Sequence, residues 1–268
     1  MKRITVLMLV FALVIAFSLT GCSQPASDEV SGDMTDMEYV LDKGVLIVGI
    51  TDFAPMDYKD ANGEWIGFDA DMARDFAEYL GVDVEFVEID WDNKIMELNS
   101  KAIDCVWNGM TLTDEVKNGM ECSNPYCNNA QVVVVPADVA DKYKDKESIA
   151  ELTFAVEASS AGEKVVNGLG YESIAVQTQS AALMEVAAGT ADACVIDLLM
   201  AGAMIGEGTS YPQLTYTVAL NSEEYGVGFR KGSDLAGKLN EFFSKSYADG
   251  SMMEYAKKYG VHESIIPQ

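Results

Sequence analysis

Two polar segments carry residue types that could hold a small polar molecule. The first is "NGMT" at residues 108–111, which follows the run "AIDCVW", and the second is Asp197, which ends the run "ADACVI". Amides, hydroxyls and carboxylates supply hydrogen-bond donors and acceptors. Gly109 lacks the Cβ that would keep a ligand away from the backbone. These residue types indicate that two separate parts of the chain bind a polar ligand.

Asp197, Ser159 and Ser160 each have a second interpretation. They stand where a strand is expected to give way to a helix. Asp and Ser are common helix N-caps for structural reasons alone, whereas the free N–H groups of a helix N-terminus also make a site for an anion. From the residues alone, both capping and ligand binding remain open at these positions.

Alternating strand and helix patterns position these segments. In the first half, the predicted order is strand 44–50, helix 67–81, strand 83–89, helix 90–101 and strand 102–107. In the second half, it is strand 131–136, strand 152–158, helix 159–169, strand 173–178, helix 180–189, strand 191–196 and helix 197–206. Such alternation favours parallel sheets covered by helices. Ligands bind beyond the carboxyl ends of such strands, so we expect the polar turns after residues 107 and 196 to line a site.

The N-terminus has the pattern of an export signal. "MKR" precedes a continuous apolar run that ends in "LTGC" at Cys22. The run is slightly short for a membrane span, which favours a signal peptide over residues 1–21. "LTGC" resembles a bacterial lipobox, which implies cleavage before Cys22 and lipidation of its thiol. The small, polar and acidic residues 22–36 predict a flexible tether.

Composition excludes several classes of partner. The chain has 18 basic and 43 acidic residues, so nucleic acid would be repelled. Its single histidine, His262, and its scattered cysteines predict neither a metal site nor a cofactor. Cys105 and Cys194 lie in apolar runs and are predicted to be buried free thiols. Cys122 and Cys127 could form a disulfide, which their spacing leaves open.

An ordered set of motifs resembles one known family. "GVLIVGITDFAPMDY", "KAIDCVWNGMTLT", "CSNPY", "AGTADACVID" and "YGVGFRKGS" follow the order of bacterial extracellular solute-binding proteins of family 3, the polar amino-acid receptors of ABC importers. The resemblance runs from about Asp42 to Tyr259. It implies an α/β, two-lobed, periplasmic-binding-protein-like type II clamshell, in which each lobe is a mixed, mostly parallel sheet flanked by helices. Lobe 1 would comprise residues 37–131 and 226–268, lobe 2 residues 132–225, and the last two helices would pack on lobe 1.

The resemblance also implies a set of ligand-binding residues. An aromatic wall at Phe53 and an apolar wall at Trp91 would pack on the ligand, although the first could be core and the second a helix staple. Asp197 would bind the ligand's ammonium. The remaining residues, whose backbone, hydroxyl or helix N-terminal groups would bind the amino and carboxylate groups, are Asn108, Gly109, Met110, Thr111, Ser159 and Ser160.

One position departs from the family pattern. The family's "T-x-x-R" arginine, which clamps the ligand's carboxylate, is replaced by Val116 in "TDEV". Lys117 is adjacent but would point roughly 100° away on a helix. Either the carboxylate is held differently, or the ligand lacks one. Asp197 and Glu157 are both available in the second lobe, and acids favour a cationic group on the ligand. We therefore expect a relative preference for a cationic or zwitterionic amine.

The resemblance implies a receptor without catalytic residues. It would be a monomer anchored to the membrane by lipid, bind an amino acid or amine, and deliver it to an ABC permease. An enzyme on the same scaffold, such as a dehydratase, is an alternative because Glu157 and Asp197 could act as a general acid. A sensor that signals through a membrane partner is a second alternative.

Replacing Cys22 with Ala tests the lipid anchor. We expect the variant to leave the membrane fraction, because the acyl chains would have no thiol to modify. Immunoblots of membranes washed with carbonate make the measurement, with Cys105→Ala as the control. A Cys22→Ala protein that stays with washed membranes would place the anchor elsewhere.

Overall fold

The computed structural model describes residues 34–268. The predicted signal peptide, Cys22 and most of the predicted tether lie outside the described residues. Helix α1 (Asp36–Lys43) begins inside the segment predicted as tether. The Thr35 hydroxyl accepts the Glu38 N–H and the Glu38 carboxylate accepts the Thr35 N–H, so a capping box fixes this start.

The first lobe is built on a sheet with the strand order β4-β1-β5-β13-β6, and β7 also pairs with β13. Its strands are β1 (Val45–Ile50), β4 (Asp83–Glu88), β5 (Cys105–Thr111), β6 (Glu121–Cys122), β7 (Cys127–Asn129) and β13 (Glu223–Phe229). Its helical segments are α1, α2 (Phe68–Leu80), η1 (Trp91–Asn93), α3 (Lys94–Asn99), α4 (Asp114–Gly119), α8 (Leu235–Asp249) and α9 (Ser251–Lys258). A small hairpin joins β2 (Tyr58–Lys59) to β3 (Trp65–Ile66).

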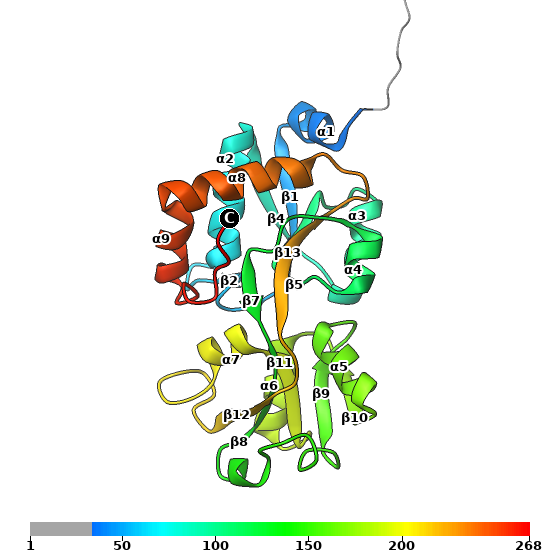
Figure 1. Cartoon of the computed structure of the whole chain (residues 1–268), viewed down its shortest axis with the longest axis vertical. Coiled ribbons are helices and arrows are strands. Elements are labelled where there is room, and N and C mark those ends of the chain that lie inside the picture. The colour runs from blue at the N-terminus through cyan, green and yellow to red at the C-terminus, as the bar shows by residue number, and fades with distance from the viewer. Residues whose placement is uncertain (1–33) are drawn as a thin grey trace, which may run out of the picture. The chain divides into compact units, whose positions relative to one another are not determined.

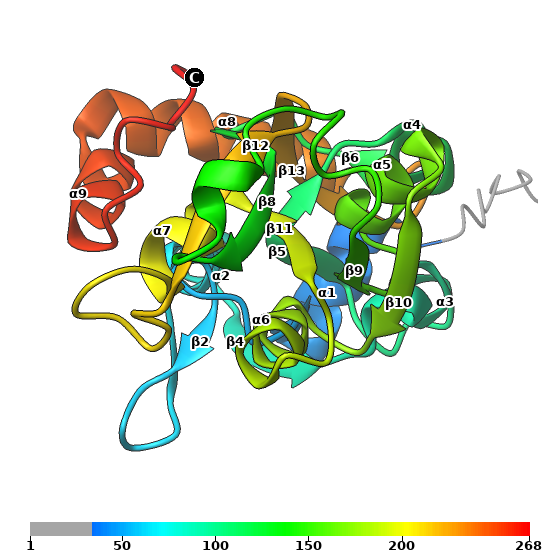
Figure 2. The same cartoon turned by 90° about the horizontal axis from the view of Figure 1, so that it is seen from below.

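The second lobe has a sheet with the order β10-β9-β11-β8-β12. Its strands are β8 (Gln131–Pro136), β9 (Thr153–Glu157), β10 (Glu172–Val176), β11 (Ala193–Asp197) and β12 (Leu214–Ala219). Its helical segments are η2 (Ala140–Lys142), α5 (Ala161–Leu169), α6 (Gln179–Ala188) and α7 (Leu198–Met204). Alternate residues of its central strands face different helices: Val132 and Val134 share a core with α6, and Val133 and Val135 share one with α5. Figure 2 accordingly shows α5 and α6 on opposite sides of this sheet.

One strand in each sheet runs against the others, and both are crossover strands. β13 is antiparallel to β5, β6 and β7, and β8 is antiparallel to β11 and β12. The remaining strands within each sheet share one direction, which agrees with the predicted mixed, mostly parallel sheets. Figure 1 shows that β7 leads into β8 and β12 leads into β13 between the lobes.

The crossovers shift the expected lobe boundaries by a few residues. Residues 223–225, expected in lobe 2, lie in β13 of the first sheet, and Gln131, expected in lobe 1, begins β8 of the second. β13 starts early because Glu223 and Tyr225 already pair with β7. Helices α8 and α9 pack against α2 in the first lobe, as the resemblance implied (Figure 1).

The cysteines of the described chain are all free thiols. Cys105 and Cys194 are buried, as predicted. Cys122 and Cys127 are also free, because they pair with Gly228 and Tyr225, three residues apart on β13. Side chains three residues apart on a strand point to opposite faces, so the disulfide left open by the sequence does not form in this structure. No helix in residues 34–268 has the length and apolar character needed to cross a membrane.

A buried acid lies at the edge of the first lobe's core. The Asp57 carboxyl is wholly buried and has no hydrogen-bond partner within the described chain. Burial, together with the charge of Asp69, raises the pKa of Asp57 well above its ordinary value, and Arg74 only partly opposes this. Because the folded-state pKa is raised, the stability linked to Asp57 is fully present below its ordinary pKa of 3.8 and is lost as the pH rises toward the folded-state pKa.

Asp57→Asn should therefore flatten the pH dependence of stability. We expect a gain of about 1–3 kcal/mol at pH 8, because an amide carries no charge to bury, and almost no gain near pH 4. Urea unfolding at both pH values makes the measurement. The exposed Asp138→Asn serves as the control, and an equal effect of both substitutions at pH 8 would contradict the prediction.

Candidate ligand-binding site

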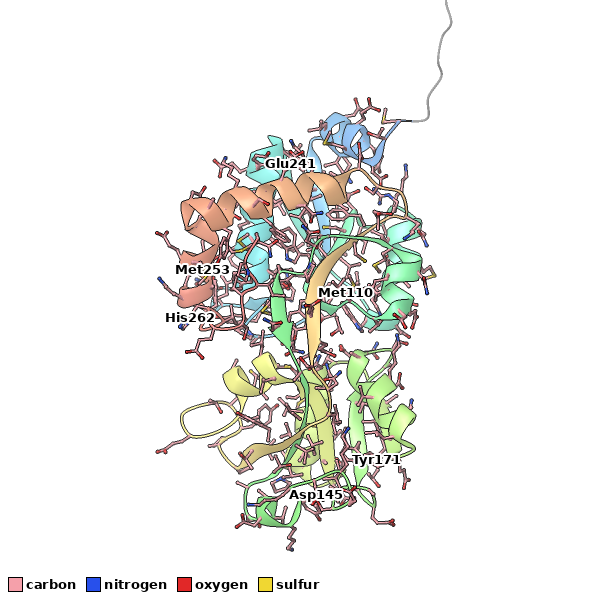
Figure 3. The ribbon with its side chains drawn as sticks, in the orientation of Figure 1. Met110, Asp145, Tyr171, Glu241, Met253 and His262 are labelled. Atoms are coloured by element: carbon pink, nitrogen blue, oxygen red, sulfur yellow. The ribbon has the colours of Figure 1, made fainter. Side chains whose placement is uncertain are left out.

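A pocket between the lobes brings all the predicted ligand-binding residues together. It encloses about 460 Å³ of empty space, including open solvent at its mouth. The first lobe contributes β5, η1 and the loop after β1, and the second contributes the ends of β9 and β11. Figure 3 places Met110 on the sheet of the first lobe, whereas Asp145 and Tyr171 lie far from it in the second. The predicted residues that line the pocket are Phe53, Trp91, Asn108, Gly109, Met110, Thr111, Ser159, Ser160 and Asp197.

An irregularity in β5 shapes the first-lobe wall. The polar turn expected after residue 107 is wrong, because β5 continues to Thr111. Met110 pairs with Gly226 and Val106 with Gly228, so three residues of β5 oppose one of β13. Such a bulge bends a strand and redirects its side chains. Gly109 sits within it at φ 53°, in the left-handed region that favours glycine.

Buried acceptors hold the bulge from behind. The Gly109 N–H donates to Asp69 Oδ2 over 2.6 Å, and the Tyr126 hydroxyl donates to the same carboxylate. Burial raises the pKa of Asp69 to about 7, and these hydrogen bonds oppose the rise. The Gly109 N–H is thus engaged by the protein itself. Asn108 Oδ1 accepts the Thr51 N–H, while Asn108 Nδ2 has no partner among residues 34–268.

Two aromatic side chains form walls of the pocket. Phe53 is only 3% exposed and meets Tyr225 edge-on, so it belongs to the core and lines the pocket at once. Its ring closely covers Gly109, because a Cβ at that glycine would lie 2.3 Å from Phe53 Cε1. Trp91 begins η1, and its ring lies under the Lys94 ammonium at 4.6 Å from the ring centroid.

In the second lobe, the start of α5 faces the pocket. Ser160 is the N-cap, and its hydroxyl accepts the Glu163 N–H over 3.0 Å. Ser159 has φ 57°, and its N–H donates to the Glu163 carboxylate over 2.8 Å. The capping role is therefore realised for Ser160. Ala161, the first residue of α5, also lines the pocket.

Asp197 occupies the N-cap position of α7 but makes no capping hydrogen bond with its side chain. Its Oδ1 instead accepts from Asn129 Nδ2, from Gln131 Nε2 at 2.9 Å and from the Tyr225 hydroxyl at 2.8 Å. Its Oδ2 accepts from Gln179 Nε2. The side chain is thus held by four donors from the crossovers and α6, at the inner end of the pocket.

Three ionisable side chains of the pocket have unusual pKa values. Burial raises the pKa of Asp197 to about 8, with the charge of Glu223 adding to the effect. Burial likewise raises the pKa of Glu157 to about 8, with Asp197 adding and Lys94 opposing. Burial lowers the pKa of Lys94 to about 8. Such opposed shifts within one pocket are typical of functional sites.

Several residues that line the pocket were not singled out by the sequence analysis. Lys94 stands three residues after Trp91 on a predicted helix, so the two share a face, a spacing that could have revealed it. Gln179 gave no signal, because it reaches Asp197 from a different helix. Val116, at the arginine position of the family, is also part of the lining. The other lining residues that the sequence did not single out are Thr51, Thr113, Ala161 and Lys164.

Hydrogen bonds and an ion pair join the two lobes. Lys94 Nζ of the first lobe donates to the Ser159 carbonyl of the second over 3.3 Å. Gln177 donates to Asp90 over 2.7 Å, and Lys164 pairs with Glu115. Across residues 34–268, no group of three or more His, Cys, Asp or Glu is arranged to hold a metal ion.

Comparison with known proteins identifies the family. Residues 46–262 match bacterial extracellular solute-binding proteins, family 3. The chain belongs to this family. It is 30% identical over 232 residues to the L-arginine-binding protein of Pseudomonas aeruginosa, with 82% of this chain and 89% of that protein covered. Family membership places the chain outside the cytoplasm.

Solved structures of relatives confirm the type II periplasmic binding fold. A mutant of ArgBP from T. maritima superposes with a TM-score of 0.78 at 31% identity, covering 84% of this chain and 98% of the other. The ancestral amino-acid-binding protein AncCDT-1, a precursor of cyclohexadienyl dehydratase, superposes with a TM-score of 0.77 at 30% identity, covering 83% and 98%.

Gly109→Ala tests the close packing of Phe53 on the bulge. A left-handed backbone alone should cost about 1–2 kcal/mol for any Cβ, and the contact with Phe53 should add about 1–3 kcal/mol of overpacking. Gly232→Ala is the matched control, since it has φ 80° with open space around the Cβ. Chemical unfolding compares the two, and equal losses would show that the Phe53 ring yields freely.

Proposed function

We propose that this family member is a lipid-anchored receptor that binds a zwitterionic amino acid between its lobes and delivers it to an ABC importer. The observation that carries the proposal is the charge pattern of the pocket. Asp197 and Glu157 lie on the second-lobe wall, and the Lys94 ammonium lies on the first. The pocket therefore offers acids of the second lobe to a ligand's ammonium and the Lys94 ammonium to its carboxylate.

Asp197 is the acid best placed to hold the ligand's ammonium. A buried ammonium needs a carboxylate partner, because an unpaired charge in a closed pocket is costly. Four donors already fix the orientation of the Asp197 carboxylate. An arriving ammonium favours the ionised form, which lowers the pKa of Asp197 from about 8. Phe53 and Trp91 cover the remaining apolar part of the ligand.

The presence of Lys94 revises the preference expected from the sequence. Val116 indicated that the pocket lacks the family's clamp for a carboxylate, which favoured a cationic or zwitterionic amine. Lys94 supplies a cation from a different element, so we propose an amino acid rather than an amine without a carboxylate. The relatives compared above are named for arginine or amino-acid binding, which supports the same class of ligand.

Transport explains the two-lobed architecture better than catalysis does. Two crossovers, at residues 129–131 and 220–223, connect the lobes, and the pocket lies between them. If the two crossovers act as a hinge, opening of the lobes would admit the ligand, and closure would bury it for delivery to a permease. A lipid on Cys22 would keep this receptor, acting as a monomer, at the membrane that holds the permease.

A dehydratase-like enzyme is the second candidate, and Glu157 is the observation that favours it. This buried acid lines the pocket with a pKa of about 8, so it is protonated at neutral pH and could act as a general acid. Mass spectrometry of a bound compound before and after incubation distinguishes the two. A receptor returns its ligand unchanged, whereas an enzyme returns a product.

Asp197→Asn tests the proposed function on the purified mature domain. We first expect one or more of the standard amino acids or cystine to raise the melting temperature of the native protein. Asp197→Asn should then bind that amino acid at least tenfold more weakly, since a charge-assisted hydrogen bond contributes about 1.5–3 kcal/mol. Calorimetry makes the measurement, and the exposed Asp192→Asn, directly before the same strand, is the control.

Two outcomes would contradict the proposal. A protein whose melting temperature responds to no amino acid in the panel is not an amino-acid receptor. Undiminished affinity in Asp197→Asn would show that another group binds the ligand's ammonium, and Glu157 would be the next residue to test.

A further inference from the structure

Lys94 is a buried cation without a carboxylate partner. Two basic residues are buried in the described part of the chain, Lys94 and Arg230. Arg230 forms ion pairs with Asp36 and Asp104. Lys94 forms none with the residues that the structure describes, although it is only 6% exposed. Buried charges are normally paired, so the partner of Lys94 is expected to come from outside the protein.

The ammonium of Lys94 has a hydrogen to spare. An ammonium carries three donors. Two of them are directed at the backbone carbonyls of Trp91, at 2.9 Å, and Ser159, at 3.3 Å. Within residues 34–268, the third has no acceptor in hydrogen-bond range. Since Lys94 lines the pocket, an acceptor on a bound molecule can complete its set.

A second unpaired donor lines the same pocket. Asn108 is 3% exposed, and its Nδ2 has no partner among the described residues. The backbone N–H of Thr51 fixes the orientation of this amide by donating to Oδ1, so Nδ2 is a donor by necessity. The spare hydrogen of Lys94 and the unpaired Nδ2 of Asn108 both need an acceptor. An oxygen that carries negative charge also compensates the buried ammonium.

We propose that Lys94 is the counter-ion of the ligand's carboxylate and determines the preference for amino acids over amines. This inference rests on the proposed function. The carboxylate lies between Lys94 of the first lobe and the N-terminus of α5 in the second, beside Ala161. One anionic group thereby bridges the lobes.

Two other roles for Lys94 predict different behaviour. A lysine that only packs its stem on Trp91, or only bridges the lobes, would affect every ligand equally. A lysine that served as the partner of Glu157 would form an ion pair with it. Among residues 34–268, the Lys94 ammonium instead donates to the carbonyls of Trp91 and Ser159. The decisive readout is thus the preference between two ligands that differ only in the carboxylate.

The test compares each amino acid with its carboxamide by calorimetry. The probes are L-arginine with L-argininamide and L-histidine with L-histidinamide, together with the standard amino acid that gives the largest thermal shift and its amide. The variants are Lys94→Met, Lys94→Gln and Lys94→Arg. Lys117→Met is the control, because Lys117 is an exposed cation of the same lobe next to Val116.

We expect the native protein to bind the amino acid at least tenfold more tightly than its amide. In Lys94→Met and Lys94→Gln, the affinity for the amino acid should fall at least tenfold and that for the amide less than threefold. Lys94→Arg should retain part of the preference, and Lys117→Met all of it. Two neutral variants guard against one of them failing to fold.

Several results would overturn the inference. The first is a native protein that shows no preference between acid and amide, a result that requires no variant. The second is an equal loss of affinity for acid and amide in both neutral variants. The third is a loss of the preference in Lys117→Met. Absence of binding by every amino acid tested is a different result, which removes the proposed function itself.

Discussion

Two carboxylates share two amide side chains at the point where the chain crosses between the lobes. Asn129 Nδ2 donates to both Asp197 and Glu223, and Gln131 Nε2 does the same. An amide nitrogen has two hydrogens, so each amide can serve both acids at once. Without these donors, two acids so close together would repel each other inside a poorly solvated junction. The arrangement of the two sheets depends on this cluster, because its members come from β7, β8, β11 and β13.

The same cluster connects the crossovers directly to the pocket. Asp197 lines the pocket, while its carboxylate is bonded to both crossovers. Glu223 also accepts the Thr111 hydroxyl, and Thr111 is a pocket residue of the first lobe. A charge that arrives beside Asp197 therefore changes the strength of hydrogen bonds that run through the crossovers. Under the proposed function, ligand charge and lobe geometry would be coupled through these direct contacts.

The fold followed from local patterns, and the pocket followed from them only in part. Apolar runs and helical periodicity located the main strands and helices because each pattern lies within one short segment. Lys94 and the supports of Gly109 depend on pairings that no local pattern encodes: Asp69 lies 40 residues before the glycine it holds, and Lys94 meets Ser159 from 65 residues away. The β5 bulge was likewise missed, because it arises from the register with β13 rather than from "WNGMT" itself.

Charge balance explains why a closed pocket of this kind suits a zwitterion. At neutral pH, Glu157 with a pKa of about 8 is mostly protonated, and Lys94 with a pKa of about 8 is mostly charged. An ammonium that ionises Asp197 then leaves the positive charge of Lys94 uncompensated unless the ligand also brings a carboxylate. A ligand with both groups makes the buried assembly neutral, which avoids the cost of a net charge in a poorly solvated space. An amine without a carboxylate leaves the Lys94 charge to be compensated by an acid such as Glu157, which burial holds in its protonated form.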